Sequence, residues 1–275
     1  FNMKKKYKIK HLNQMQFIAI GFAVMILIGM LLLMLPISSK TGEWTGPLEA
    51  LLTSTSSSCV TGLIAFDTYT HWSLFGQIII ILLIQVGGLG FITIGVGFAI
   101  LFQKNLGLRS RDLLKESVNA EDLGGIIKYW KSIIKATMLF EGVGALVLAI
   151  RFIPVFGVGR GIYYGIFHSV SAFCNAGFDL MGCFGQYSSL TPFQSDPVVN
   201  ITIMALIVTG SLGFMVWRDL WHKRFRWNRF TLHTKIVLIV TFILIFGGAL
   251  MLYITERNAA FNGLDEPTTV LASLF

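Results

Sequence analysis

Two short glycine-bearing stretches, at 59–63 and at 174–178, hold the residues best placed to do chemistry. They read CVTGL and CNAGF, and each directly follows a short apolar stretch, 47–58 or 161–173. Neither contains a carboxylate or an imidazole, so a ligand would meet backbone carbonyls and the negative end of a preceding helix. Rings of such carbonyls can replace the hydration shell of a cation. The candidate coordinating residues are Cys59, Val60, Thr61, Gly62, Cys174, Asn175, Ala176 and Gly177.

These residue types also have simpler interpretations. Gly62 or Gly177 alone would be an ordinary turn glycine, but two in register, each after a half-length helix, favour a cation-coordinating loop. Cys59 and Cys174 could be nucleophiles, yet the sequence supplies no base and orienting acid beside them. The chain has only three cysteines, which are too few and too scattered for a disulfide framework or a zinc site.

The composition indicates an all-helical integral membrane protein surrounded by lipid. Apolar residues make up 54% of the 275 residues and charged residues only 13%, about half the share found in soluble domains. A spanning helix needs about 20 mostly apolar residues. Five runs satisfy this length, and the first has no signal-peptide cleavage site. The runs are 17–35, 75–102, 133–150, 198–217 and 236–254.

The positive charge of the chain is explained by membrane topology and does not indicate a nucleic-acid partner. If the two short apolar stretches are re-entrant helices, segments 1–16, 103–135 and 218–235 lie together in the cytoplasm and hold 18 of the 22 lysines and arginines. If both stretches span, only 13 lie inside. The positive-inside rule therefore favours the re-entrant arrangement. Irregular backbone at membrane depth must line a cavity or be buried in protein, so this arrangement implies a pore or a binding site.

The chain repeats itself at a spacing of 115 residues. This shift aligns Ser54, Ser56, Cys59 and Gly62 with Ser169, Ser171, Cys174 and Gly177. Each unit is a span, a short helix, a glycine loop and a second span, so successive units start on the same side of the membrane. Parallel repeats of this kind surround an axis along the membrane normal.

The repeat divides the chain into successive segments. A third unit begins near its end, so we expect the natural protein to continue past Phe275, with a cysteine-equivalent position about seven residues later and a glycine about ten residues later. A further span and a fourth unit should follow, around a pseudo-fourfold pore. The segments are a cytoplasmic segment 1–16, unit one at 17–102, a cytoplasmic loop 103–132, unit two at 133–217, a cytoplasmic loop 218–235 and the start of unit three at 236–275.

Several motifs together resemble the Trk/Ktr/HKT superfamily of potassium transporters, and most of all the bacterial Ktr membrane subunit. The stretch 59–62 is similar to a reduced potassium-channel filter. The resemblance covers essentially the whole chain, although cysteine stands at positions 59 and 174 where that family usually has small polar residues. The motifs that carry it are LPI at 35–37, VTGL at 60–63, QVGGLGF at 85–91, SAFCNAGF at 171–178 and LHTK at 232–235.

The resemblance implies a function and a set of partners. It implies potassium uptake across a bacterial plasma membrane, with the N-terminus cytoplasmic, K⁺ held by filter carbonyls and Na⁺ as a coupling or activating ion. The complete subunit would form a homodimer on a cytoplasmic ring of nucleotide-binding regulatory subunits. The chain itself would be neither an enzyme nor a carrier of an organic cofactor.

Three further features could have a functional or a purely structural role. Glu141 lies near the middle of an apolar run, where a functional role and a structural pair with a residue beyond the printed sequence are equally supported. His168 is expected to be packed and hydrogen-bonded rather than a ligand. The stretch GGLG at 87–90 follows no strand and precedes no Lys-Ser/Thr, so close helix packing explains it better than nucleotide binding.

Two other functions are possible from the residues alone. An alternating-access carrier of a small organic solute is also built on broken helices, but it requires polar side chains converging at the midplane. Glu141 is the one ionisable candidate there. An intramembrane enzyme is less favoured because no catalytic constellation is present.

The charge count predicts that residues 109–131 and 218–229 are cytoplasmic and that Glu43 is outside. In a cysteine-free background, Glu116→Cys and His222→Cys should resist an impermeant thiol reagent applied to intact cells, whereas Glu43→Cys should react. Labelling of either cytoplasmic position, with the cells intact, would contradict the re-entrant arrangement.

Overall fold

The computed structural model describes residues 14–90, 126–257 and 259–275. Throughout these ranges the chain is helical and contains no strand, apart from one isolated bridge between Ser39 and Trp72. The predicted all-helical class is therefore confirmed for the described part of the chain. Three predictions fall wholly or largely outside it: the cytoplasmic N-terminal segment, the second half of the span 75–102, and most of the loop 103–132.

The first group of helices contains one short helix between two longer ones. Pro47 occupies the first turn of the short helix, where a missing N–H costs nothing. The last helix of the group is capped by Ser73, whose hydroxyl accepts a hydrogen bond from the Gly76 N–H. The elements are α1 (Gln14–Met34), the 3-10 turn η1 (Pro36–Ser38), α2 (Pro47–Cys59), α3 (Thr68–His71) and α4 (Leu74–Leu89).

The second group repeats this order. Its first helix contains Pro154, continues to Phe156 and ends where Gly157 adopts a positive φ of 82°. The short helix then begins at Val158, three residues before the predicted start. The elements are α7 (Ile126–Phe156), α8 (Val158–Phe173), the turns η2 (Met181–Cys183) and η3 (Thr191–Phe193), and α9 (Pro197–Ser211).

The predicted span 198–217 is not one straight helix, because the chain bends by 94° between α9 and the next helix. Gly213 has a φ of +79° between α9 and the following helix α10 (Phe214–His222), a conformation that side chains resist. The Trp217 indole N–H donates to the Thr209 carbonyl and stabilises the bend. Gly90, which ends α4, has nearly the same φ of +82°.

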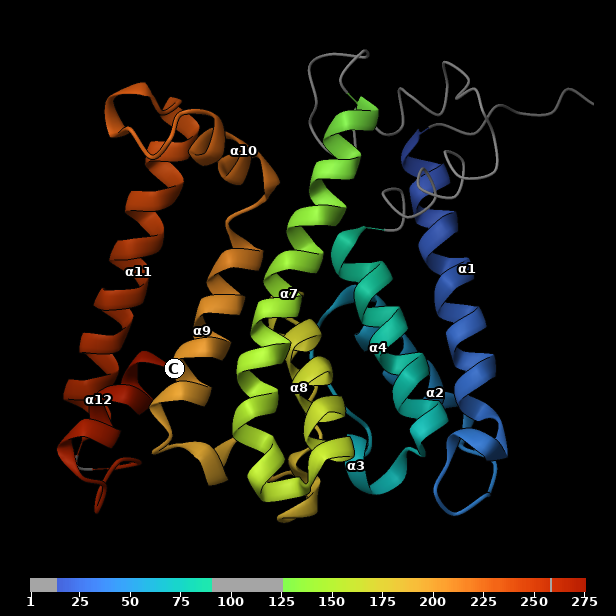
Figure 1. Ribbon diagram of the computed structural model, residues 1–275. Helices are drawn as coiled ribbons and strands as arrows, with labels where there is room; N and C mark the ends of the chain where they lie inside the picture. Colours follow the sequence, from blue (N-terminus) through green and yellow to red (C-terminus); the bar gives the residue numbers. More distant parts are fainter. Residues whose placement is uncertain (1–13, 91–125, 258) are drawn as a thin grey trace, which may run out of the picture.

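The chain ends with two helices beside this bend. The turn η4 (Trp227–Arg229) leads into the long α11 (Leu232–Glu256), and a loop then leads into the short α12 (Glu266–Leu274). In Figure 1, α2, α8 and α12 start near the lower end of the molecule and end midway along their long neighbours. At three places the chain thus has a helix that stops midway along its neighbours.

Length and composition identify fewer spanning helices than the five predicted runs. Among the described residues, Trp130–Phe156 and Leu232–Glu256 are long and apolar enough to cross a membrane, and the bent pair α9 and α10 would make a third. The apolar helices Ile18–Met34 and Leu74–Leu89 are shorter. The apolar window of α11 has none of its residues buried inside the chain, which suits a helix facing lipid.

The buried core lies where the two groups meet. Apolar side chains from α1, α4, α7, α8 and α9 form one continuous cluster, whose largest fully buried members are Trp72, Phe152 and Phe167. Hydrogen bonds also join the groups, since the Tyr163 hydroxyl on α8 donates to the Gln77 side chain on α4 at 3.1 Å. The two groups therefore pack as one body around the short helices.

Candidate functional site

Two backbone turns of the same form follow α2 and α8. We call residues 59–63 the first glycine loop and residues 174–178 the second glycine loop. Val60 and Asn175, at equivalent positions, both adopt left-handed backbone angles, with φ of 57° and 60°. Two residues later, Gly62 and Gly177 have φ of +79° and +73°. Only glycine takes such angles readily, so the glycines are needed for the path of each loop.

Each loop is anchored to the last turn of its own short helix by equivalent hydrogen bonds. The Thr61 N–H donates to the Ser56 carbonyl at 2.9 Å, and the Ala176 N–H donates to the Ser171 carbonyl at 2.8 Å. These pairs are 115 residues apart. The side chains add further bonds, because the Ser171 hydroxyl donates to the Phe178 carbonyl and the Thr61 hydroxyl donates to the Ser56 hydroxyl. The loop conformation is therefore fixed from within each group.

The two glycine loops meet at their glycines. A Cβ atom built on Gly62 would lie 2.9 Å from the Ala176 carbonyl oxygen and 3.7 Å from the Gly177 Cα. A Cβ atom on Gly177 would lie 3.5 Å from the Gly62 Cα. Residues far apart in the sequence but equivalent in the repeat are thus neighbours. If an axis relates the two groups, such neighbours must lie close to it.

The loop cysteines occupy different surroundings. Cys59 is exposed, whereas Cys174 is half-buried against Gly88, whose ideal Cβ would lie 2.6 Å from the Cys174 Sγ. Both thiols are free. No cluster of three or more histidine, cysteine or acidic side chains suited to a metal ion occurs in the described ranges. Besides their backbone carbonyls, the two loops offer only the Thr61 hydroxyl and the Asn175 amide as oxygen ligands, and both of these already hydrogen-bond to serines.

Glycines on the neighbouring helices let those helices approach the loops. A side chain on Gly87 of α4 would overlap the Ser58 carbonyl oxygen, and one on Gly210 of α9 would overlap the Phe173 carbonyl oxygen. Ser58 and Phe173 directly precede the two loops and are equivalent in the repeat. The motif at 87–90 therefore serves close packing, as its composition predicted.

Each short helix is also hydrogen-bonded to the long helix that precedes it in the sequence. The Ser54 hydroxyl donates to the Ile26 carbonyl of α1, and the Ser169 hydroxyl donates to the Glu141 carbonyl of α7, both at 2.7 Å. The two serines are 115 residues apart, and so are the two carbonyls that they bind. Each short helix is thus hydrogen-bonded to the preceding helix at equivalent points of the repeat. These hydrogen bonds set the depth at which the loops begin.

Glu141 has a hydrogen-bond partner within this chain, whereas the sequence analysis considered only a partner beyond Phe275. The Gln85 amide on α4 donates to the Glu141 carboxylate on α7 at 3.0 Å, and the Glu141 side chain is buried. The equivalent position in the first group is the apolar Ile26, so this polar pair occurs once in the two groups. Gln85 was visible in the sequence as one of the few polar residues within the apolar run 75–102.

His168 is a packed histidine, as expected. It is 2% exposed; its Nδ1 lies 2.7 Å from the Tyr164 carbonyl, and its Nε2 lies 3.2 Å from the Leu180 N–H. Since the carbonyl can only accept and the N–H can only donate, the ring carries its proton on Nδ1 and is neutral. His168 therefore holds the segment after the second glycine loop against α8.

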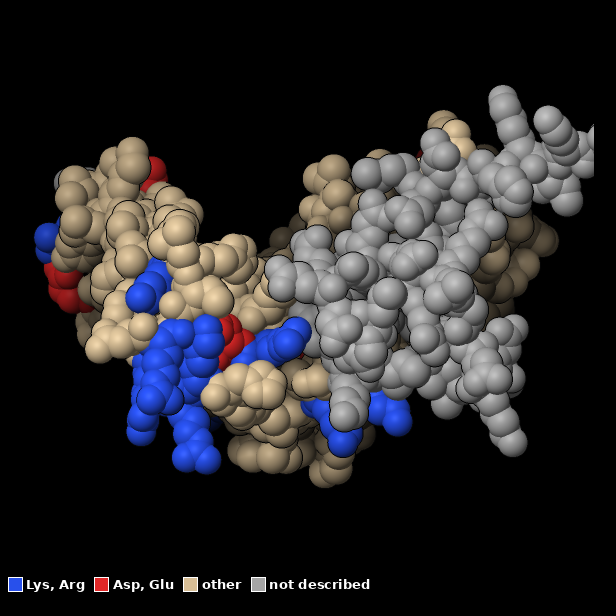
Figure 2. All heavy atoms as spheres, turned by 90° about the horizontal axis from the view of Figure 1, so that it is seen from above, with Lys and Arg blue, Asp and Glu red and all other residues tan. Residues whose placement is uncertain are grey.

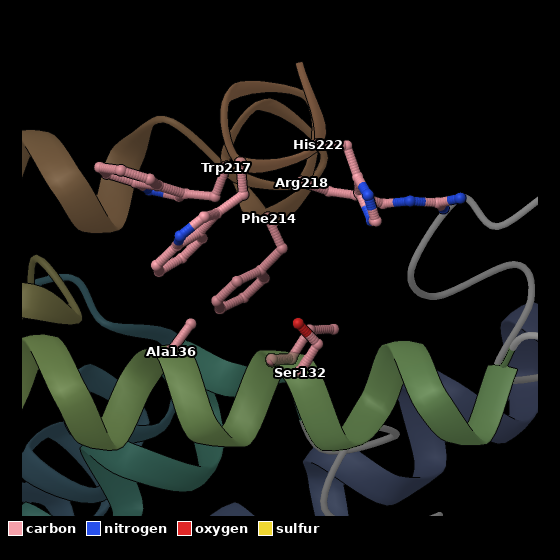
Figure 3. Close-up of a pocket in the computed structure, with 8 residues that line it drawn as sticks. Ser132, Ala136, Phe214, Trp217, Arg218 and His222 are labelled. Carbon is pink, nitrogen blue, oxygen red and sulfur yellow. The ribbon is translucent and has the colours of Figure 1, made fainter. Parts of the chain in front are cut away.

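A groove lies between α7 and α10, near the upper end of the molecule in Figure 1. It encloses about 340 Å³. In Figure 3 the rings of Phe214 and Trp217 point from α10 toward Ala136 and Ser132 on α7. Arg218 and His222 line its far end. This groove is remote in the fold from the glycine loops and shares no residue with them.

The groove adjoins a basic face. Figure 2, viewed from above, shows lysine and arginine side chains gathered over α10 and the turn that follows it. Asp219 lies within this cluster and binds Lys223 and Thr231. Burial alone would raise the pKa of the Asp219 carboxyl, but these hydrogen bonds outweigh it and hold the pKa below its usual range. The basic residues are Arg218, Lys223, Arg224, Arg226 and Arg229.

Comparison with known proteins identifies the family. The sequence profile of the TrkH family, described as a cation transport protein, matches residues 1–272. The chain belongs to the TrkH family. The potassium/sodium uptake protein NtpJ of Enterococcus hirae is 44% identical over 256 residues, which are 93% of this chain and 55% of that protein.

Other relatives of this TrkH-family chain are named as parts of Ktr systems. The Ktr system potassium uptake protein B of Bacillus subtilis is 40% identical over 88% of the chain, and protein D of the same organism is 33% identical over 97%. The chain spans 53% and 59% of their lengths. The predicted relationship to the Ktr membrane subunits is confirmed. These relatives are cation transport proteins and not enzymes, and membership of a transporter family places the chain in a membrane.

The Gln85–Glu141 bond gives a testable stability prediction. Gln85→Leu should leave a buried carboxyl without its donor and lower the free energy of unfolding by about 1–3 kcal/mol. The double variant Gln85→Leu/Glu141→Leu should lose less than the sum of the single variants, because both polar groups are then gone. Thermal melting of the full-length protein in detergent measures this, with Met138→Leu on the exposed face of α7 as the control. Fully additive losses would contradict the pairing.

Proposed function

We propose that this TrkH-family chain carries part of a potassium pathway, in which ions cross the cell membrane through a filter of backbone carbonyls. The observation that carries the proposal is the meeting of Gly62 with Gly177 and the Ala176 carbonyl. Two loops of like conformation, equivalent in the repeat, converge where an axis through the molecule would pass. The filter residues are those of the two glycine loops, 59–62 and 174–177.

The physical chemistry of the loops favours a large monovalent cation. The loops contain no carboxylate, so a cation would be held by carbonyl dipoles. Both α2 and α8 end at a glycine loop, and a helix C-terminus carries about half a negative charge. Such a site compensates the loss of water from K⁺ without binding it so strongly that it cannot leave.

Several further features belong to the proposal. The pore architecture consists of parallel units 17–102, 133–217 and 236–275, supported by the hydrogen bonds and glycine contacts that recur at the same spacing. The N-terminus is cytoplasmic, because the basic residues near 218–229 then lie inside. Sodium acts as a coupling or activating ion, since one relative is named a potassium/sodium uptake protein.

The proposed partners follow from the relatives. Two of them are named as components of Ktr systems, which supports a translocating subunit that works within a larger assembly. We infer a homodimer of full-length subunits bound to a cytoplasmic ring of nucleotide-binding regulatory subunits. The exposed basic face over α10 would then lie on the side of that ring.

Substitution at Gly62 tests the proposed filter. Gly62→Ala, made in the full-length protein, puts a methyl group against the Ala176 carbonyl, and potassium uptake should be lost or sodium admitted. Gly62→Asp adds a charge and should have a larger effect. Gly42→Ala is the matched control, because Gly42 also has a positive φ, +73°, but no atom lies within 4 Å of its ideal Cβ. Uptake of ⁸⁶Rb⁺ and ²²Na⁺ at equal membrane abundance is the measurement.

Gly62→Ala and Gly42→Ala share the backbone strain of an alanine at positive φ. They differ in the atoms that the new methyl group contacts. Gly42→Ala should therefore leave uptake and selectivity unchanged. If Gly62→Ala transports both ions as the parent protein does, the glycine loops are not the filter.

A further inference from the structure

We propose that the Asp67 carboxylate clamps the segments that follow the two glycine loops to each other and thereby sets the ion selectivity of the filter. Asp67 lies five residues after Gly62, outside the loop itself. The inference rests on the proposed function, because selectivity has meaning only if the loops form the ion pathway. It adds a positioning residue that touches no ion.

The two oxygens of Asp67 bind two different parts of the chain. Oδ1 accepts a hydrogen bond from the Thr70 N–H at 2.7 Å and so caps α3 in the first group. Oδ2 accepts a hydrogen bond from the Tyr187 N–H at 3.0 Å, in the segment that follows the second glycine loop. The second bond joins residues 120 apart in the sequence. The carboxylate is 3% exposed, so water competes little for these bonds.

The second group is shaped to receive this carboxylate. Gly182, in η2, faces it directly, and a Cβ atom at that position would lie 2.6 Å from the Asp67 Cγ and overlap its oxygens. Gly182 therefore provides the space in which the carboxylate sits. Tyr187 adopts a φ of 61°, which is uncommon for a residue with a side chain and persists only where the surroundings enforce it. This conformation directs the Tyr187 N–H to Asp67.

The segment that Asp67 holds is connected rigidly to the second glycine loop. Leu180, one residue before η2, donates its N–H to His168 on α8. Nearer the loop, the Phe178 carbonyl accepts the Ser171 hydroxyl. A displacement of η2 would therefore be transmitted to Gly177 through a few residues that are hydrogen-bonded at both ends. Asp67 thus constrains how far the two glycine loops can separate.

Asp196 offers a matched control on the same side of the molecule. It caps α9 by accepting the Val198 and Val199 N–H groups, and it pairs with Arg151 on α7. Its role is the same as that of Asp67 at a helix start, but all its partners belong to the second group. Losing either cap should lower stability by a similar amount, whereas only Asp67 joins the two groups.

The experiment compares Asp67→Asn and Asp196→Asn in the full-length protein. Asparagine keeps one acceptor oxygen but presents an NH₂ group to the other N–H donor, so one side of the clamp opens. The ratio of ⁸⁶Rb⁺ to ²²Na⁺ uptake should fall by about threefold to tenfold in Asp67→Asn, as expected for the loss of one hydrogen bond of ordinary strength. It should be unchanged in Asp196→Asn. Melting temperature and membrane abundance are measured alongside.

A second variant guards against simple misfolding. Gly182→Ala displaces the carboxylate from the other side while Asp67 stays in place, and it should shift the uptake ratio in the same direction. An unchanged ratio in both the Asp67 and the Gly182 variants would overturn the clamp, as would an equal shift in Asp196→Asn. A parent protein that takes up both ions without preference would overturn the clamp alone, whereas a parent protein that takes up neither ion would overturn the proposed function as well.

Discussion

Irregular backbone at the depth of a membrane must find its hydrogen-bond partners within the protein, because hydrocarbon offers none. In the proposed pathway, the glycine loops at 59–63 and 174–178 meet that constraint from within each group. The loop N–H groups of Thr61 and Ala176 return to carbonyls in the last turn of the preceding helix. The loop carbonyls that remain are the groups available to an ion. The surrounding helices hold the loops in the conformation that pairs these N–H groups and leaves those carbonyls free.

The supporting contacts recur because the chain repeats. Serines on the short helices bind the preceding long helices at Ile26 and Glu141, and glycines on the following helices admit the Ser58 and Phe173 carbonyls. Links between the two groups are of a different kind, since they occur once each and use unlike side chains. The pairs Gln85–Glu141, Gln77–Tyr163 and Asp67–Tyr187 are of this sort. Repetition thus builds each loop, and single polar pairs place one loop against the other.

Much of this could be predicted from the sequence, because the relevant signals are local. Apolar runs predict helices, Pro47 predicts the start of a short one, and glycines at a constant spacing predict loops that need a positive φ. The family relationship was also predicted from motifs and is confirmed by the comparisons. The meeting of Gly62 with Gly177 was only implied, since a repeat gives equivalent positions but not their separation.

The features that sequence reasoning missed depend on tertiary contacts. Nothing in an uninterrupted apolar run distinguishes a straight span from one that bends by 94°, although Gly213 could have suggested it. The partner of Glu141 was sought beyond the sequence because pairing between α4 and α7 depends on how the two groups pack. Asp67 attracted no notice, since its partner is far away in the sequence.

The central claim, that carbonyls of the two glycine loops coordinate the transported ion, can be tested by locating the ion. An anomalous-difference map of the full-length protein crystallised with Rb⁺ would reveal the site directly. The account predicts a peak beside the backbone oxygens of residues 59–62 and 174–177, which Na⁺ at the same concentration does not displace. Absence of a peak there, at an Rb⁺ concentration that saturates uptake, or a peak held instead by the Glu141 carboxylate, would contradict it.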